Sequence, residues 1–281
     1  MNPSMLISKY SIPAILGTLT INGFIEREMN NPEIDTFKPI DTVSIIIPCY
    51  NEEPFIKKTL QSIRGQSIIN EYPEMFEIIL ANNNSTDNSV PIAENYVNKV
   101  INVTQKGKLY ARNQGILAAK GNIIVAADAD LYYPPLWLNT LLEPFNNTNS
   151  PTYNPTISGT SGSIYNPNIP GIPVPVYNIA QYINKTLLDR TNMSGANSAF
   201  WKHKYYNIGM FNESINQMNI KEMHQAEEIQ FGRNLSKLGK IVFKLNAMGI
   251  HLGGERTGCR IGSTNKEYCV SQGISIKRFG Q

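Results

Sequence analysis

Two aspartates are the residues best placed to do chemistry, because they directly follow an apolar run. Asp128 and Asp130 flank Ala129, immediately after residues 123–127. Carboxylate oxygens are preferred ligands of Mg²⁺ and Mn²⁺, which usually bind through one or two carboxylates together with substrate phosphates. The spacing therefore predicts a site for a divalent metal and a diphosphate, although Asp-x-Asp on its own also occurs in ordinary surface loops.

The segments that must position these carboxylates alternate between two patterns. Short apolar runs predict strands over 43–47, 76–80, 100–103 and 123–127, and helical spacing predicts helices over 54–64, 90–97, 108–119 and 135–145. Such alternation predicts an α/β fold with a mainly parallel, twisted sheet flanked by helices. Ligands bind such a sheet at the carboxyl ends of its strands, where the polar segments 48–52, 82–87, 104–107 and 128–130 fall.

The second half of the chain has a different composition. Residues 146–175 are rich in Pro, Asn, Ser and Gly and predict loops around one short strand at 156–165. Helices are expected over 176–188 and 223–238, and a strand over 240–245, followed by a loop that ends near 249.

Composition excludes several classes of protein. The net charge of +3 over 281 residues comes from scattered basic residues, which argues against nucleic-acid binding. The three cysteines have no zinc-ligand spacing and form no disulfide framework, although Cys259 and Cys269 are able to pair, so a reducing, cytoplasmic location is expected. No stretch is long and apolar enough to cross a bilayer, which leaves peripheral membrane contact open.

Five segments, in this order and spacing over roughly residues 43–252, carry a resemblance to a known family: "VSIIIPCYNE", "NNNSTD", "GKLYARNQGILAAKGNIIVAADAD", "SGANSAF" and "AEEIQFGRNLSKLGK". The chain resembles the family 2 glycosyltransferases of the nucleotide-diphospho-sugar transferase fold, which is Rossmann-like. The resemblance implies a glycosyltransferase domain over 41–252, with a nucleotide-binding half (41–146) and an acceptor-binding half (147–252). Residues 1–40, which lack sustained periodicity and carry four prolines, are expected to form an arm packed on the domain. The Gly-rich, basic residues 253–281 are expected to form a flexible tail or lid.

The resemblance also implies a nucleotide site. Contacts to the donor are expected from Pro48, Tyr50, Glu52, Lys106, Gly107, Lys108, Arg112, Asp128 and Ala129. Asn82 stands where the family usually carries an aspartate that accepts the N3–H of uracil, and its amide oxygen can accept the same bond without the charge. Uridine is therefore the favoured base, with guanosine and thymidine as alternatives.

Metal ligands and a catalytic base are implied in the same way. Asp130, with Asp128 and the late His251, is expected to hold Mn²⁺ or Mg²⁺. Glu227 and Glu228 take the place of the family's Glu-Asp pair, whose second acid is the general base of inverting members. Acidic residues also favour the first turn of a helix, which is the plain structural interpretation of this pair.

The resulting hypothesis is an inverting, metal-dependent transferase that moves a sugar from a nucleotide-diphosphate sugar to a hydroxyl group. The acceptor, whether a glycan, a lipid-linked molecule or a protein, is left open. Two alternatives remain: a retaining transferase of the same fold, and a module that binds nucleotide sugars or glycans without turnover. Cys49, which has no base beside it in the first polar segment, is expected to be structural.

Overall fold

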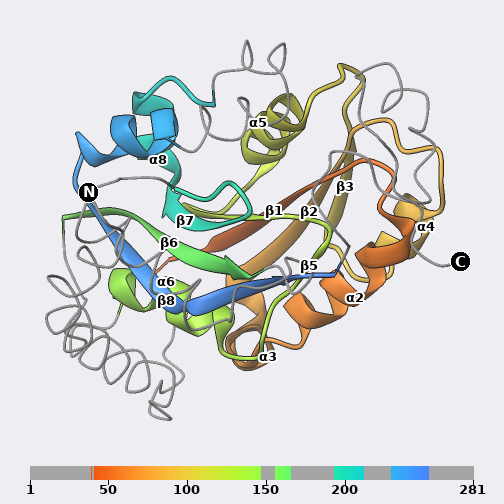
Figure 1. The fold of residues 1–281 in the computed structure, drawn as a ribbon, viewed down its shortest axis with the longest axis horizontal. Helices are drawn as coiled ribbons and strands as arrows, with labels where there is room; N and C mark the ends of the chain where they lie inside the picture. The colour runs from red at the N-terminus through yellow and green to blue at the C-terminus, as the bar shows by residue number, and fades with distance from the viewer. Residues whose placement is uncertain (1–38, 40, 147–155, 166–192, 212–228, 253–281) are drawn as a thin grey trace, which may run out of the picture.

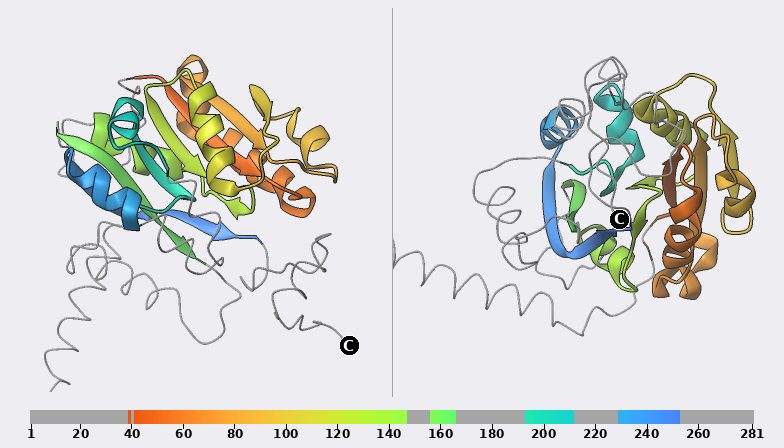
Figure 2. Two further views of the ribbon diagram at one scale, coloured as in Figure 1. Left: turned by 90° about the horizontal axis from the view of Figure 1, so that it is seen from above. Right: turned by 45° about the vertical axis from the view of Figure 1, so that its right-hand side comes forward.

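The structure is a computed structural model that describes residues 39, 41–146, 156–165, 193–211 and 229–252 (Figure 1). Eight strands form one sheet in the order β3-β2-β1-β4-β7-β6-β8-β5, with helices on both faces. The strands β1 to β4 with α2 to α5 gather on one side of the molecule, and β6 to β8 with α8 lie on the other (Figure 2). The α/β fold expected from the sequence is confirmed, and the sheet is mixed.

The parallel part of the sheet comes from the first half of the chain. It consists of β1 (Val43–Cys49), β2 (Phe76–Asn82), β3 (Lys99–Asn102) and β4 (Ile123–Ala127). β1 lies between β2 and β4, and β3 pairs with the outer side of β2. All four strands therefore end at the same edge of the sheet, which is called the carboxyl edge below.

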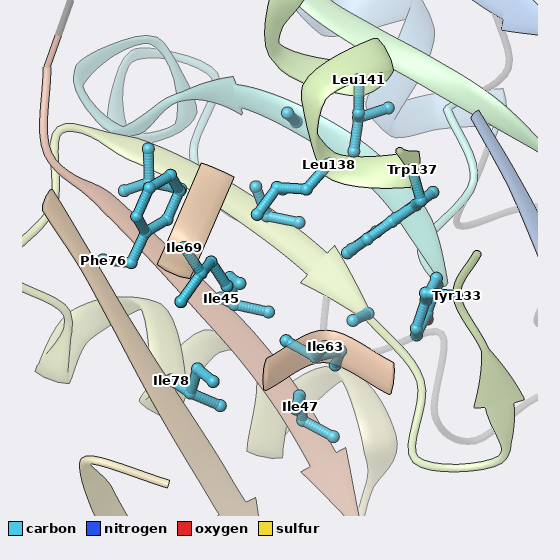
Figure 3. Packing of buried hydrophobic residues seen from close by; sticks show 14 of the residues in the cluster. Ile45, Ile47, Ile63, Ile69, Phe76, Ile78, Tyr133, Trp137, Leu138 and Leu141 are labelled. Atoms are coloured by element: carbon cyan, nitrogen blue, oxygen red, sulfur yellow. The ribbon is translucent and has the colours of Figure 1, made fainter. Parts of the chain in front are cut away.

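β1 supplies alternate residues to two separate cores. Ile45 and Ile47 pack in a cluster with Ile63 and residues of α6, as Figure 3 shows, whereas Ile46 joins a cluster with Ile116. Both faces of the strand are buried, which explains why it is a continuous apolar run in the sequence.

Helices cover both faces of the parallel strands. They are α2 (Glu53–Arg64), α3 (Ser67–Glu71), the 3₁₀ helix η1 (Pro73–Met75), α4 (Ser89–Ala93), α5 (Lys108–Ala118) and α6 (Trp137–Asn146). α5 lies on the opposite face from α2 and α6 (Figure 1). It approaches β1 so closely that a Cβ atom at Gly115 would lie 2.5 Å from Ile46 Cγ2. The predicted helix over 90–97 is wrong in length, because the helix ends at Ala93 and turns lead on to β3.

The remaining strands belong mainly to the second half of the chain. They are β5 (Leu131–Tyr132), β6 (Ile157–Tyr165), β7 (Asn197–Trp201) and β8 (Lys240–His251), and α8 (Lys202–Asn207) follows β7. β7 is antiparallel to both β4 and β6, β5 is antiparallel to β8, and β6 and β8 are parallel. The strands β1 to β4 are therefore parallel throughout, and in the second half the β6–β8 pairing is the parallel one among the described strands.

Two sequence predictions in this region are wrong. No strand was expected at 197–201, yet β7 lies in the middle of the sheet. The loop expected after residue 245 is instead strand, because β8 continues to His251 along its ladder with β6, where the register shifts between Gly162 and Ser163. Pairing with neighbouring strands holds residues that have weak strand propensity.

Several predictions concern residues outside the described ranges. They are the arm over 1–40, of which the structure describes residue 39 alone, the helix over 176–188 and the tail over 253–281. The helix predicted over 223–238 is seen from residue 229 and is helical to 236. Among the residues that the structure does describe, no helix is long and apolar enough to cross a membrane.

Candidate active site

Residues 128–130 form a turn between β4 and β5, called the Asp-x-Asp turn below. Its backbone is held from three directions. Asp128 N–H donates to the Tyr133 hydroxyl (2.9 Å), Thr59 Oγ1 of α2 donates to Ala129 O (2.9 Å), and Leu252 N–H, just after β8, donates to Asp130 O (2.9 Å). These three hydrogen bonds fix the main chain of the turn. Its two carboxylate side chains carry the negative charge.

The carboxylate of Asp128 lies between two cations of α5. Lys108 Nζ is 2.8 Å from Oδ2 and Arg112 Nη2 is 3.2 Å from Oδ1. The two cations lie one helical turn apart and so face the same way. Arg112 is fully buried, and its guanidinium also lies 5.4 Å from the centre of the Phe211 ring. A buried charge is tolerated when it is paired with an opposite charge. Lys108, Arg112 and Asp128 therefore form one ion-pair unit.

The carboxylate of Asp130 has a different neighbour. Its Oδ2 lies 3.4 Å from His251 Nδ1, because β5 and β8 pair Leu131 with His251. Asp130 is 6% exposed and His251 is 5% exposed. The other ring nitrogen of His251, Nε2, is buried and has no hydrogen-bond partner within the described part of the chain.

The imidazole nitrogen that faces the Asp130 carboxylate is Nδ1, and the 3.4 Å between Nδ1 and Oδ2 is a separation at which two ligands can share one metal ion. A carboxylate and an imidazole together fit a divalent cation such as Mn²⁺. Among the described residues, no group of three or more His, Cys, Asp or Glu side chains is arranged to hold a metal. Asp130 and His251 would therefore supply two ligands, and substrate oxygens or water the others. Asp128, already between two cations, is less suited to this role than the sequence suggested.

The segment Asn82–Ser89 lies along the same edge, between two other loops. Its three successive asparagines bind the end of β3 and the segment that follows it. Asn82 Nδ2 donates to Asn102 Oδ1 (2.9 Å), Asn83 Nδ2 donates to Val103 O (3.1 Å) and Gln105 O (2.7 Å), Asn83 Oδ1 accepts from Gly107 N–H (2.8 Å), and Asn84 Nδ2 donates to Thr104 O (2.8 Å). These bonds shape the loop that carries Lys106 and leads into α5.

The second half of the same segment binds the loop after β1. Asn51 N–H donates to Ser85 Oγ (3.1 Å), Thr86 N–H donates to Asn51 Oδ1 (2.8 Å), Glu52 N–H donates to Ser89 Oγ (2.7 Å), and Glu53 N–H donates to Asp87 Oδ2 (3.1 Å). Asn51 adopts a positive φ of 52°, which asparagine tolerates better than most residues. The segment therefore ties the loops after β1 and β3 together through its own side chains.

The resemblance implies a contact between Asn82 and the base of the nucleotide. The side-chain amide of Asn82 already makes two hydrogen bonds within the protein. Its Oδ1 accepts the Ser85 N–H at 3.0 Å, in addition to the bond from Nδ2 to Asn102, and the residue is 8% exposed. A carbonyl oxygen has two lone pairs, so one remains for a ligand. The Ser85 N–H also fixes which amide atom is the oxygen, because a backbone donor requires an acceptor.

The structure places the other predicted nucleotide residues at or near this edge. Pro48 lies within β1 and not in the loop after it. It is tolerated there because the ladder between β1 and β4 ends at Ile46 and Ala126, leaving Pro48 paired with β2 alone. Tyr50 and Glu52 are half-buried, and Lys106 is exposed.

Gly107 has φ of 142°, in the region that favours glycine, immediately before α5. The predicted catalytic residues Glu227 and Glu228 lie outside the described residues, directly before the helical residues 229–236.

Sequence reasoning missed Thr59 and Tyr133, and it placed Asn83 and Asp87 at the edge within the segment 82–87 without assigning either a role. The only local signal was the density of Asn, Ser and Asp after β2, which favours bonds from side chain to backbone. Cys49 fits its expected structural role. It is buried, and desolvation, followed by the charge of Glu52, raises the pKa of its thiol to about 12, so it is not a nucleophile near neutral pH.

Comparison with known proteins supports this description. The family model "Glycosyl transferase family 2" matches residues 44–208. The uncharacterized glycosyltransferase EpsJ of Bacillus subtilis (strain 168) is 38% identical over 109 residues, which cover 37% of this chain and 30% of that protein. The dolichyl N-acetyl-alpha-D-glucosaminyl phosphate 3-beta-D-2,3-diacetamido-2,3-dideoxy-beta-D-glucuronosyltransferase of Methanococcus voltae is 29% identical over 67% of this chain and 56% of its own length. The chain spans about a third of the length of the first curated relatives that it matches.

Solved structures share the fold at low sequence identity. The mannosyltransferase PcManGT from Pyrobaculum calidifontis, in complex with GDP-Man and Mn²⁺, has a TM-score of 0.57 at 17% identity, covering 90% of this chain and 68% of that one. S. aureus TarS 1–349 in complex with UDP-GlcNAc has a TM-score of 0.58 at 20% identity, covering 82% and 64%. These neighbours share the α/β architecture described above, and the family model matches more than half of the sequence. The chain therefore belongs to glycosyl transferase family 2.

Proposed function

We propose that this protein is an inverting glycosyltransferase that moves a sugar from a UDP-sugar to a hydroxyl group of an acceptor. Asp130 and His251 would hold Mn²⁺ or Mg²⁺, and Glu228 would be the general base. The observation that carries the proposal is the Asp-x-Asp turn, where the buried Asp130 carboxylate faces the Nδ1 of His251 at 3.4 Å and lies beside a carboxylate paired with two cations.

The metal, when bound, would neutralise charge that develops on the departing nucleoside diphosphate. The residues of the chain do the remaining work. Lys108, half-buried at the start of α5, adds positive charge at the edge where the diphosphate would lie, and the exposed Lys106 can reach the phosphates. Arg112 is fully buried and acts through Asp128, whose carboxylate it holds in place.

The transfer step balances as a single displacement. The acceptor oxygen forms a bond to the anomeric carbon as the bond from that carbon to the diphosphate oxygen breaks, and the electron pair leaves with the nucleoside diphosphate. The acceptor proton passes to the Glu228 carboxylate, and Glu227 would orient the acceptor or the helix. Attack from the side opposite the leaving group inverts the configuration.

Substrate identity is proposed from the site and the relatives together. Asn82, with one free lone pair on Oδ1, is compatible with accepting the N3–H of uracil. Guanosine stays an alternative base, since one structural neighbour binds GDP-Man. Relatives named for undecaprenyl-phosphate and dolichyl phosphate acceptors make a lipid-linked hydroxyl the first acceptor to test, before glycans and proteins. The cytoplasmic location stays a prediction.

Transfer assays on Glu228→Gln test the proposal. This change keeps the size of the side chain and removes the base, so kcat should fall about 10²–10⁴-fold with UDP-sugar affinity near that of wild type. Glu227→Gln is the matched control and should be milder. Assays with a panel of nucleotide sugars and with excess EDTA, together with the anomeric configuration of the product, complete the test. Retention of configuration, unimpaired transfer in Glu228→Gln or full activity in EDTA would each refute part of the proposed mechanism.

A further inference from the structure

We infer that Tyr133 is a positioning residue whose hydroxyl couples the Asp-x-Asp turn to the chain entering β7, and so sets the affinity for the metal and the nucleotide. The inference rests on the proposed function, because it assumes that the turn binds the donor. Tyr133 touches neither the reacting atoms nor the two carboxylates directly in the contacts described, and it acts through the main chain of Asp128.

The hydroxyl of Tyr133 makes two hydrogen bonds in opposite directions. It accepts from Asp128 N–H at 2.9 Å and donates to Ala196 O at 2.9 Å. Asp128 follows β4, and Ala196 directly precedes β7, the antiparallel neighbour of β4. One oxygen atom thus joins the turn that would hold the donor to the "SGANSAF" segment.

The hydroxyl of Tyr133 is neutral near neutral pH. Desolvation by burial, followed by the negative charge of Asp128, raises the pKa of Tyr133 well above its ordinary value of 10. Because the group stays neutral, it remains both an acceptor toward Asp128 and a donor toward Ala196. A phenolate would lose the second bond.

The ring of Tyr133 is fixed by its neighbours. Its centroid lies 4.0 Å from that of Trp137, and the two side chains lie together in Figure 3. Trp137 Nε1 donates to Asn197 Oδ1 at 2.7 Å, and Asn197 Nδ2 in turn donates to Ser163 O and Ala247 O, both at 2.7 Å. These contacts connect α6, β7, β6 and β8 to the Asp-x-Asp turn. A displacement of one of these elements can therefore be transmitted to the turn through direct contacts.

The Tyr133 side chain therefore contributes two hydrogen bonds in addition to its packing in the core. Phenylalanine would keep the packing against Trp137 but would leave the Asp128 N–H and the Ala196 carbonyl without this partner. An unpaired buried backbone group is costly, so the turn would shift or loosen to find water. The two carboxylates would move with it.

Titration of UDP in the presence of Mn²⁺ tests the inference on Tyr133→Phe. The loss of this bridge should weaken UDP affinity about tenfold and raise the Mn²⁺ concentration needed for half-saturation. Thr160→Val is the matched control, because it also removes a buried hydroxyl that donates to a main-chain carbonyl, Leu141 O at 2.8 Å, away from the turn. It should lower the melting temperature to a similar extent and change UDP affinity less than about twofold.

The outcomes separate the inference from the proposed function. If wild type binds UDP and Tyr133→Phe binds it equally well, or loses no more affinity than Thr160→Val, the inference alone is overturned. If wild type binds no nucleoside diphosphate with a metal, the proposed function falls and the inference falls with it.

A second measurement needs no variant and covers the case in which Tyr133→Phe does not fold. In the wild-type protein, UDP with Mn²⁺ should slow amide hydrogen exchange in residues 127–131 and 194–198 together. Slowing confined to residues 127–131 would contradict the coupling.

Discussion

The Asn82–Ser89 segment and the Asp-x-Asp turn both follow central parallel strands at the carboxyl edge, but they are built in opposite ways. In the first, side chains bind the main chain of neighbouring loops, as Asn83 does with Val103, Gln105 and Gly107. In the second, other parts of the protein bind the main chain, and the side chains hold charge.

This difference separates residues that shape the edge from residues that hold charge on it. A polar side chain occupied by the protein contributes chiefly to stability, and its loss leaves a buried group unpaired. A carboxylate on an independently anchored turn can be changed with less effect on the fold. Substitutions in the two regions should therefore affect rate and stability in different proportions.

The largest expected effect is on the rate, at Asp130. Asp130→Asn should lower transfer at least about 10³-fold, or about 4 kcal/mol, because the site loses a negative ligand for the metal. The melting temperature without ligand should stay near that of wild type, since the bonds to the backbone of the turn remain. Asp41→Asn, at the start of β1 on the opposite edge, is the matched control and should keep full activity. An active Asp130→Asn enzyme would contradict the assignment.

A smaller effect, on stability, is expected at Arg112. Arg112→Met keeps the length of the side chain but leaves the buried Asp128 carboxylate with Lys108 as its cation in this unit, which should cost about 3 kcal/mol. Lys108→Met should cost only about 1 kcal/mol, because the Lys108 side chain is 29% exposed. Urea denaturation measures both. Equal stability of the two variants would mean that the burial of the cation does not determine how much each ion pair with Asp128 contributes to stability.

An effect smaller than that of Arg112→Met is expected at Asn83. Asn83→Ala removes the bonds that shape the loop before α5 and leaves Gly107 N–H without its acceptor, so the free energy of unfolding should fall by about 2 kcal/mol. Asn95→Ala is the control, because the exposed Asn95 makes only long contacts, of 3.3 and 3.5 Å, within its own segment. Thermal or urea unfolding measures the difference in stability between the two variants. Equal losses of stability would contradict the role proposed for this segment in shaping the neighbouring loops.

Local sequence patterns were enough to predict the parallel half of the fold and, together with the family resemblance, the charged residues of the site. The runs that became β1, β2 and β4 are predominantly apolar because most residues on both faces of each strand are buried. Asp128 and Asp130 directly follow β4, so the pattern of strands predicted their place at the carboxyl edge. Lys108 and Arg112 were expected beside the nucleotide from the family resemblance.

Pairing between distant segments decided the rest. β7 and the extension of β8 to His251 depend on strands 30 or more residues away in sequence, as in the pairing of Ser161 with Ser198 and of Leu131 with His251. The role of the three asparagines depends on where the loop after β3 lies, and that of Tyr133 on the position of Ala196.

The sequence by itself thus determined which residue types follow the central strands, because burial of both faces imposes a continuous apolar pattern that can be read locally. Only the tertiary structure decided which side chains hold the protein together and which hold charge. A hydrogen bond needs its two partners within about 3 Å, and that distance is set by how the whole chain packs.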